Sequence, residues 1–501
     1  MSEEHISLNQ IIQFRLEKLQ KLRDGGINPY PYNFKQTHFS NEIKQAFDSL
    51  ENKDVVIAGR IMSMRKMGKA SFCHIQDGEG RIQSYIRRDD VGEEAYSNFK
   101  LLDIGDYIGI KGYVFKTKTE EISVHASELT ILSKSIRPLP VVKEKDGEIF
   151  DAFSDKEQRY RNRHLDLIVN PDVKEVFVKR AKIISSVRKF LDDKGFLEVE
   201  TPVLQPLYGG ANARPFTTHH NSLDQDLYLR IADELYLKRL IIGGIDKVYE
   251  LSKNFRNEGM DRNHNPEFTM LEAYQAYGDY ETMMELLQSM ICHVSDKVCG
   301  TLVIEQRDAD GNVTQTIDLT PDWRRAKYKD LIREKAGDNW FDLTPGQRRA
   351  RATGELQIEI DPNEQDFEVT NAVFEKLVEP TLIQPTFVTH LPKELVPLAK
   401  LSPDEPDCVE VFECCINGQE IAPAYTEQNN PIEQRERLEQ QAGGEQQKLD
   451  EDFLVALEHG MPPAGGIGIG IDRLIMMLLG QESIRDVLLF PQLKPKPTAA
   501  E

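Results

Sequence analysis

The residues best suited to chemistry are concentrated in one stretch, Val248 to Ala276. Its two halves alternate polar and apolar positions with the period of a β-strand, and a loop rich in turn residues, 257–266, joins them. The functional faces of these halves carry a guanidinium, two carboxylates and two aromatic rings, namely Arg256, Glu258, Phe268, Glu272 and Tyr274. If the halves pair as antiparallel strands, these side chains share one surface.

Such a surface suits a ligand that is polyanionic, aromatic and amine-bearing. Arginine pairs bidentately with phosphate, and aromatic rings stack on bases. The same pattern also fits an ordinary sheet with a solvated polar face, so other motifs have to decide between the two interpretations.

A second chemical motif lies in residues 409–430. Asn417-Gly418 between two alternating runs is a strong hairpin signal. A two-residue turn would place Ile416 opposite Gln419, Cys415 opposite Glu420 and Glu413 opposite Ala422. The carboxylates of Glu413 and Glu420 would then be close enough to share a Mg²⁺, although a solvated sheet edge gives the same pattern.

The third motif is the run AGGIGIGIDRLIMMLLG at 464–480. Its alternating glycines leave one strand face bare, so a ligand can approach the backbone, unless the bare face serves tight packing. The chain then enters a helix with Arg473 in the first turn, where the helix dipole and the guanidinium both favour phosphate.

Several elements must position these motifs. Residues 8–24 have helical spacing and stop at Gly25-Gly26. From 54 to 135, short strands separated by turns predict a small β-barrel. Residues 55–135 carry 12 Lys and Arg against 11 Asp and Glu, which sets this part apart in a chain of net charge −21. Interleaved helices and strands without βαβ regularity follow, and they predict an α+β domain built on an antiparallel sheet flanked by helices.

The barrel carries residues that suit single-stranded nucleic acid. Basic residues cluster near Arg65, and Phe72 and Gln83 fall on adjacent predicted strands. Stacking on an aromatic platform beside cations is how oligonucleotide-binding barrels hold bases. A core Phe72 with a solvated basic cluster is the alternative.

Composition narrows the class of protein further. No run approaches the ~18 apolar residues of a membrane span. The N-terminus lacks a signal or transit pattern. The six cysteines form no CxxC pair, so we expect neither a zinc site nor disulfides, and the cytoplasm as compartment.

Three segments in order, FLEVETPVLQP, FRNEG with HNPEFTMLEAY, and GIGIGIDRL, resemble the motifs of class II aminoacyl-tRNA synthetases. Residues 209–244, HNPEFTM and MPPAGGIGIGIDR are similar to the lysine-specific members of that family. The resemblance extends from Ile11 to Lys496. It implies a helical extension at 1–50, an anticodon-binding OB-fold at 51–136, a linker at 137–170 and a catalytic domain at 171–496.

The resemblance also implies roles for individual residues. ATP would be held by Arg256, Glu258, His264, Phe268 and Arg473, of which Arg256 and Arg473 are catalytic. Lysine would be held by Gly210, Glu234, Glu272, Tyr274, Tyr425 and Glu427. Mg²⁺ would be bound by Glu413 and Glu420, and the anticodon would be read by Arg65, Phe72, Gln83 and Glu128. The implied partners are L-lysine, ATP, tRNA(Lys) and a second copy of the chain, which would meet the first through motif 1 (196–206).

One position departs from the family pattern. The family usually carries Asn where this chain has Pro423, and that Asn helps to hold the substrate carboxylate. Because side chains alternate along a strand, Glu420 and Tyr425 can share a face only if the chain bends or bulges near Pro423. Two alternatives therefore stay open: an aspartyl- or asparaginyl-type synthetase, which would need a cation where Glu272 and Glu427 lie, and a non-catalytic paralogue that binds RNA or nucleotide.

Overall fold

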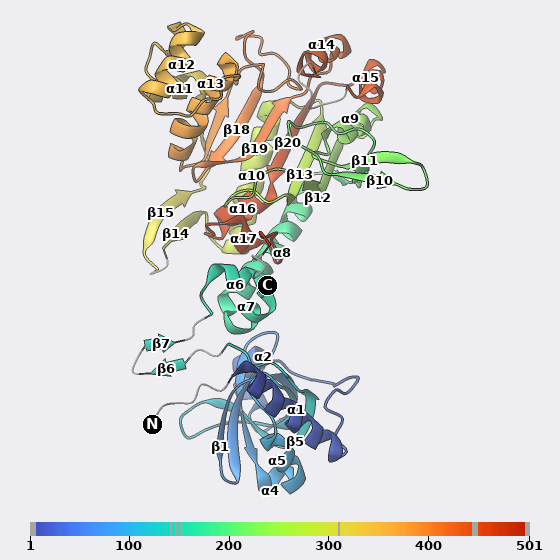
Figure 1. The fold of residues 1–501 in the computed structure, drawn as a ribbon, viewed down its shortest axis with the longest axis vertical. Helices are drawn as coiled ribbons and strands as arrows, with labels where there is room; N and C mark the ends of the chain where they lie inside the picture. The colour runs from blue at the N-terminus through green and yellow to red at the C-terminus, as the bar shows by residue number, and fades with distance from the viewer. Residues whose placement is uncertain are drawn as a thin grey trace, which may run out of the picture. The chain divides into compact units, whose positions relative to one another are not determined.

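The computed structural model describes residues 7–140, 143–145, 148–150, 153–308, 311–442 and 449–495. The chain forms two compact units, 1–153 and 154–501 (Figure 1). The division after Phe153 falls inside the predicted linker 137–170. Residues 1–6 of the predicted helical extension and residue 496 of the predicted catalytic domain lie outside the described residues.

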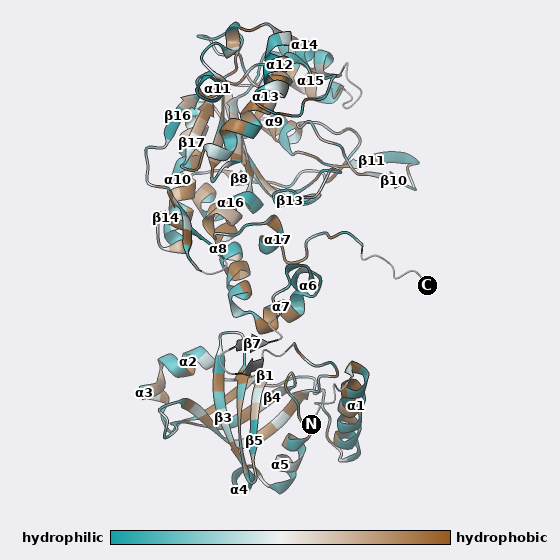
Figure 2. Cartoon of the chain, turned by 60° about the vertical axis from the view of Figure 1, so that its left-hand side comes forward, coloured by the Kyte–Doolittle hydropathy of each residue, from teal (hydrophilic) through white to brown (hydrophobic). Residues whose placement is uncertain are grey.

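Unit 1 is built around a closed five-stranded barrel with the strand order β1-β2-β3-β5-β4. The strands are β1 (Asp54–Met67), β2 (Ala70–Gln76), β3 (Arg81–Arg87), β4 (Tyr107–Lys116) and β5 (Ile122–Ser133). Buried positions alternate with partly exposed ones along β2 and β3, and Figure 2 shows hydrophobic and hydrophilic residues along the barrel strands. The inward-facing Val and Ile side chains form one core, which confirms the predicted barrel.

Helices surround this barrel. They are α1 (Leu8–Asp24), α2 (Ser40–Gln45), α3 (Phe47–Leu50), α4 (Arg88–Val91) and α5 (Glu93–Lys100). A capping box between Ser7 and Gln10 begins α1, and the helix ends at Gly25, as its sequence predicts. The side chains of Leu19 and Leu22 on its apolar stripe are buried.

Unit 2 is organised by an eight-stranded sheet with the order β16-β17-β18-β19-β20-β13-β12-β8. Its strands are β8 (Leu197–Glu198), β12 (Lys247–Phe255), β13 (Glu267–Ala276), β16 (Arg324–Lys327), β17 (Thr386–Thr389), β18 (Val411–Ile416), β19 (Gln419–Thr426) and β20 (Ala464–Gly470). Neighbours pair antiparallel except at the two ends of the sheet, where β12 with β8 and β16 with β17 are parallel. The predicted α+β class is confirmed, and parallel strand pairs occur only at the two ends of the otherwise antiparallel sheet.

Smaller sheets complete the strands of unit 2. β9 (Leu204–Gln205), β10 (Thr217–His220) and β11 (Gln225–Leu229) form one, and β14 (Val303–Arg307) pairs with β15 (Val313–Asp318). Residues 309 and 310 in the turn of this second hairpin lie outside the described residues. β6 (Lys143–Lys145) and β7 (Glu148–Phe150) pair in unit 1, within the part of the chain predicted to be a linker.

The helices of unit 2 pack on both sides of the large sheet and at its ends (Figure 1). They are α6 (Lys156–Arg161), α7 (Arg163–Val169), α8 (Pro171–Asp193), α9 (Glu234–Ile242), α10 (Tyr280–Cys299), α11 (Tyr328–Ala336), α12 (Pro345–Gly354), α13 (Asp366–Val373), α14 (Pro431–Ala442), α15 (Glu451–Glu458), α16 (Ile471–Leu478) and α17 (Ile484–Val487). Short helical turns lie at Trp340–Asp342, Phe374–Val378 and Glu379–Thr381. None of the helices in these described ranges is long and apolar enough to cross a membrane.

The hairpin of β18 and β19 differs from its predicted register in one informative place. Asn417 and Gly418 have φ values of 61° and 71°, as a two-residue primed turn requires. Cys415 pairs with Glu420 as expected, but Cys414 pairs with Ala422, so Ile421 is an extra, bulged residue. The prediction that Glu413 lies opposite Ala422 is therefore wrong, because the bulge moves the partner of Glu413 to Pro423.

Candidate active site

A cavity of about 660 Å³ lies on the face of the large sheet formed by β13, β18, β19 and β20. Nearly all residues that the sequence assigns to ATP, lysine and Mg²⁺ line it, namely Gly210, Glu234, Arg256, Glu258, His264, Phe268, Glu272, Tyr274, Glu413, Glu420, Tyr425 and Arg473. The exception is Glu427, which lies behind the cavity wall. The predicted pairing of Val248–Ala276 as antiparallel strands is confirmed, with Glu250 opposite Glu272 and Asn254 opposite Phe268.

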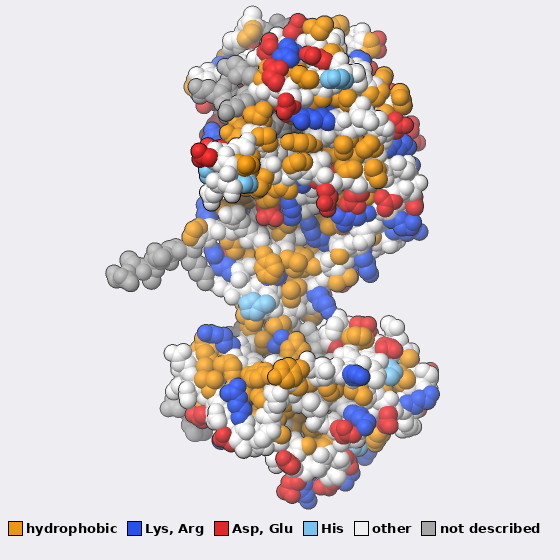
Figure 3. Space-filling model, turned by 90° about the vertical axis from the view of Figure 1, so that its right-hand side faces the viewer, with side chains coloured by type: hydrophobic (Ala, Val, Ile, Leu, Met, Phe, Trp, Pro, Cys, Tyr) orange, Lys and Arg blue, Asp and Glu red, His pale blue; other side chains and the backbone are white. Residues whose placement is uncertain are grey.

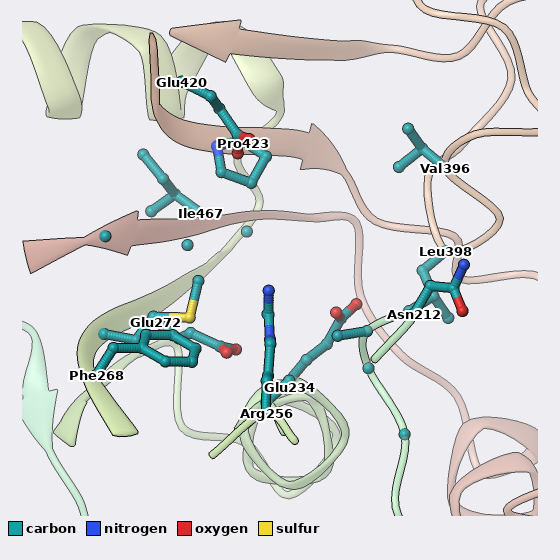
Figure 4. A pocket seen from close by; sticks show the side chains of 18 of the residues that line it. Asn212, Glu234, Arg256, Phe268, Glu272, Val396, Leu398, Glu420, Pro423 and Ile467 are labelled. Atoms are coloured by element: carbon teal, nitrogen blue, oxygen red, sulfur yellow. The ribbon is translucent and has the colours of Figure 1, made fainter. Parts of the chain in front are cut away.

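Arg256 stands in the middle of this cavity, with Phe268 and Glu272 on one side and Glu234 on the other (Figure 4). Its guanidinium lies 5.1 Å from the centre of the Phe268 ring. Within the described part of the chain it forms no ion pair, and its Nε has no hydrogen-bond partner. Burial lowers the pKa of Arg256, an effect opposed by nearby carboxylates. A desolvated cation of this kind binds a carboxylate or phosphate strongly.

The second arginine, Arg473, reaches the cavity from the first turn of α16. Its guanidinium donates to the Glu420 carbonyl at 3.0 Å and lies 2.9 Å from Nε2 of His264. His264 is held in turn by Asp261, whose carboxylate lies 2.8 Å from its Nδ1. The two arginines therefore face one cavity, and His264 connects the loop between β12 and β13 to α16.

Asp472 fixes where α16 meets β13. Its Oδ2 accepts a hydrogen bond from the backbone N–H of Thr269 at 2.7 Å, directly beside Phe268. Its other oxygen lies 2.6 Å from the guanidinium of Arg180 on α8. This buried contact ties three elements together and holds Phe268 and Arg473 in register.

Four carboxylates gather at the β18–β19 side of the cavity: Glu375, Glu379, Glu413 and Glu420. Glu413 has no cation partner among the described residues, and burial together with the other three acids raises its pKa well above the usual range. Like charges this close are stable in a buried site only when protonated or when shared by a cation. The donor set of Glu413 and Glu420 therefore fits a hard divalent cation such as Mg²⁺.

Acids also crowd the opposite side, where β13, β19 and α9 meet. Glu272 accepts hydrogen bonds from the backbone N–H of Asp233 at 3.0 Å and the hydroxyl of Tyr274 at 3.2 Å. It pairs with no cation in the described ranges. Burial, followed by the charges of Asp233 and Glu234, raises the pKa of Glu272 well above its usual value. A ligand ammonium placed here would relieve that cost.

The remaining residues that are predicted to bind the substrate lysine form a connected group. The Tyr425 hydroxyl donates to Glu234 at 2.6 Å, and Lys238 pairs with both Glu234 and Glu427. Burial and then Glu234 raise the pKa of Glu427 to about 8, while Lys238 opposes the rise. Glu427 is only 1% exposed, so it lies behind the cavity wall and is shielded from solvent.

The bulge at Ile421 explains how both even- and odd-numbered residues of β19 reach one cavity. Without it, Glu420 would lie on the face opposite Pro423 and Tyr425. With it, all three line the cavity, and Ala422 and Ala424 enter the core below. The expected bulge near Pro423 is thus confirmed, and Figure 4 shows Glu420 and Pro423 together on β19.

The barrel of unit 1 presents the predicted nucleic-acid residues on its outer face. Arg65 lies opposite Phe72, and the Phe72 and Tyr85 rings are 4.8 Å apart. Gln83 donates to Glu121 at 2.7 Å. By contrast, Glu128 is ion-paired with Lys111 on β4 at 2.7 Å, and no contact joins it to this group in the described residues.

Three acidic or basic residues were missed by sequence reasoning. Glu121 bonds Gln83 and His74, and only the pairing of β3 with β5 reveals that it lies beside them. Asp233 anchors Glu272 through its backbone, and burial raises its own pKa to about 7. Lys238 lies four residues after Glu234 on a helix, and this spacing alone would have suggested the ion pair.

Comparison with known proteins agrees with this geometry. Residues 155–494 match the family of class II tRNA synthetases (D, K and N), and residues 55–132 match the OB-fold nucleic acid binding domain. The chain therefore belongs to the class II tRNA synthetases.

Curated relatives place the chain more narrowly. It is 51% identical to the lysine–tRNA ligase of Syntrophomonas wolfei, with all of both chains covered. It is 52% identical to that of Pelotomaculum thermopropionicum over 98% of this chain and 96% of the relative. For that of Moorella thermoacetica, the identity is 50% over 97% and 98%. Within the class, the chain groups with the lysine–tRNA ligases.

The close packing behind the cavity gives a first prediction. A Cβ on Gly466 would lie 1.9 Å from Glu427 Oε1 and 2.5 Å from the Tyr274 ring. We expect Gly466→Ala to displace both side chains and to destabilise the fold by about 1–3 kcal/mol, as overpacking does. Thermal unfolding and a crystal structure of the variant measure this.

Gly468→Ala is the matched control, since a Cβ there meets only the flexible end of Met270 at 3.0 Å. Equal melting temperatures for the two variants would contradict the assignment of a tightly packed wall behind Gly466.

Proposed function

We propose that this chain activates L-lysine with ATP and transfers the lysyl group to tRNA(Lys). The observation that carries the proposal is a single cavity that holds a guanidinium and a carboxylate, neither of which has an ion-pair partner among the described residues. Arg256 stands in the middle of the cavity, and Glu272 lies on the side where β13, β19 and α9 meet. An amino acid with a carboxylate and a second ammonium group matches both.

The arginines supply orientation and charge neutralisation. Arg256 contacts the lysine carboxylate and the α-phosphate, which brings the attacking oxygen and the phosphorus together. Arg473 binds the terminal phosphate region, where it stabilises the departing pyrophosphate. Phe268 stacks on the adenine ring, and Glu258 and His264 hold the loop over the nucleotide. No protein nucleophile is required.

Magnesium fits the acids on the β18–β19 side. Glu413 and Glu420 would hold it, and the unrelieved charge of Glu413 supports this assignment. When bound, Mg²⁺ neutralises phosphate charge. Arg473, which lies 3.8 Å from Glu420, keeps that carboxylate oriented.

Specificity for lysine comes from the acidic end of the cavity. Glu234 binds the α-ammonium beside Gly210. Glu272 and Glu427, with Tyr274 and Tyr425, surround the side-chain ammonium. A shorter or neutral side chain would leave buried carboxylates unpaired. These acids do not suit an aspartate or asparagine substrate. Pro423 lines the cavity where the family has Asn, so Arg256 carries more of the carboxylate binding here.

Unit 1 recognises the anticodon through Arg65, Phe72 and Gln83, and we include Glu121 in that group in place of Glu128. The residues share one face, with an aromatic ring beside a cation.

Two further proposals concern the whole protein. The cytoplasm is its compartment, which six free thiols support.

A homodimer forms through motif 1. Leu197, Val203 and Leu204 in this segment are 39–52% exposed, and Leu223 nearby is 67% exposed. Figure 3 views the molecule from the side on which β10 and β11 lie in Figure 1, and hydrophobic side chains gather on that face of unit 2. Exposed apolar area of this kind is typical of subunit interfaces.

Exchange of labelled pyrophosphate into ATP tests the activation step. We expect exchange that depends on lysine and not on aspartate or asparagine. Glu272→Gln should lower kcat/KM for lysine by about 100-fold or more, because an amide cannot balance the ammonium charge. ATP binding should be retained. If the unsubstituted protein shows no lysine-dependent pyrophosphate exchange, the result favours the non-catalytic paralogue.

Lysine binding should depend on pH in a defined direction. Burial and the neighbouring acids raise the pKa of Glu272, the lining carboxylate without a cation partner in the described ranges, well above its usual value. An ammonium ligand favours the ionised acid, so binding releases protons and tightens as pH rises. Calorimetry in buffers of different ionisation enthalpy counts the released protons, and a flat affinity with no proton release would refute the assignment.

The barrel and the catalytic unit should be separable by mutation. Phe72→Ala removes the stacking platform, so tRNA charging should fall about 10-fold or more at subsaturating tRNA. Pyrophosphate exchange should stay within twofold. Glu128→Gln is the control, and we expect it to leave charging unchanged. Equal loss of charging and exchange in Phe72→Ala would contradict separate roles.

A further inference from the structure

Lys238 is a buried cation that lies behind the acidic end of the cavity. Its side chain is 0% exposed and does not line the cavity. Its Nζ is 2.5 Å from Glu234 Oε1, pairs also with Glu427, and lies 5.5 Å from the centre of the Tyr425 ring. Lys238 therefore contacts three residues of the proposed lysine pocket without reaching the substrate position.

Glu427 depends on this contact more than its neighbours do. In the part of the chain that the structure describes, the carboxylate oxygens of Glu427 have no hydrogen-bond partner other than the ammonium group of Lys238. Lys238 is its one ion-pair partner there. Behind the carboxylate, the bare backbone of Gly466 leaves no room for further atoms. The orientation of Glu427 therefore rests on a single ammonium group.

Glu234 and Glu427 also repel each other. Two buried carboxylates that share a site do not both stay ionised unless a cation lies between them. Tyr425 donates a neutral hydrogen bond to Glu234, which orients that acid but does not balance its charge. Lys238 is the one described cation that pairs with either acid.

The acids of the pocket thus fall into two kinds. Glu272 has backbone and hydroxyl donors but no cation, so it is open to an ammonium from the substrate. Glu234 and Glu427 already share an internal ammonium.

We propose that Lys238 is a positioning residue for lysine specificity: a permanent internal counter-ion that balances the charge of Glu234 and Glu427 and holds both acids in place. The two ammonium groups of the substrate then meet Glu234 and Glu272 in a pocket whose wall has a fixed charge and orientation. This inference rests on the proposed function, since it assumes that the cavity binds lysine.

The test compares lysine with norleucine, which has the same four-carbon side chain without the ammonium. Lys238→Met keeps the side-chain length and removes the charge, so one of the two acids takes a proton. We expect the ratio of norleucine to lysine dissociation constants, measured by calorimetry, to fall about 10-fold or more, with ATP binding within twofold. Lys238→Arg should recover part of the ratio, because it restores the cation.

Lys134→Met is the matched control. Lys134 is equally buried in unit 1 and pairs with two acids, Asp103 at 2.7 Å and Asp106 at 2.9 Å. Its loss should lower the melting temperature in the same way but leave the norleucine-to-lysine ratio unchanged. A purely structural role for Lys238 predicts that the two variants behave alike, and that result would overturn the proposal.

A double variant keeps the test decisive if Lys238→Met does not fold. Lys238→Met with Glu427→Gln removes one positive and one negative charge, so the buried charge balance is preserved. If Lys238 acts through Glu427, the double variant should discriminate within about threefold of Glu427→Gln alone. If the two substitutions instead lower the norleucine-to-lysine ratio by the product of their separate effects, the inference is overturned. Absence of lysine binding by the unsubstituted protein would instead refute the proposed function.

Discussion

The structure of unit 2 depends on keeping charged groups out of water beside an open cavity. Among the described residues, Arg256 forms no ion pair, and neither the buried Glu272 nor the half-buried Glu413 pairs with a cation. Such groups cost free energy in the absence of a ligand. The surrounding sheet, rich in buried apolar residues, supplies the stability that permits them. The site is therefore organised to be neutralised by what binds.

Two geometric devices bring these charges together. The bulge at Ile421 turns Glu420 onto the face of Pro423 and Tyr425, and the contact of Asp472 with Thr269 joins α16 to β13. Both act on backbone position and contribute no group to chemistry themselves. Because the cavity walls come from strands far apart in the chain, small shifts in either device would separate the arginines from the acids.

The two ends of the cavity differ in how their charge is balanced. On the β18–β19 side, four acids converge with Arg473 at the margin, which suits a divalent ion shared with phosphate. On the α9 side, Lys238 balances two acids and leaves Glu272 unbalanced. The cavity thus offers a site suited to a divalent cation on one side and a carboxylate suited to an ammonium on the other.

The sequence by itself determined the local elements and most of the residues that line the candidate site. Periodicity predicted the barrel and the strands at 248–276, Asn417-Gly418 predicted the hairpin turn, and the ordered motifs identified Arg256 and Arg473, because these signals depend on residues near one another in the chain. Only the tertiary structure decided the partner of Glu413, the contact of Gln83 with Glu121, and the placement of Glu427 behind the cavity against Lys238. A bulge, a pairing between distant strands and a buried ion pair are set by packing across the fold, and no local pattern records them.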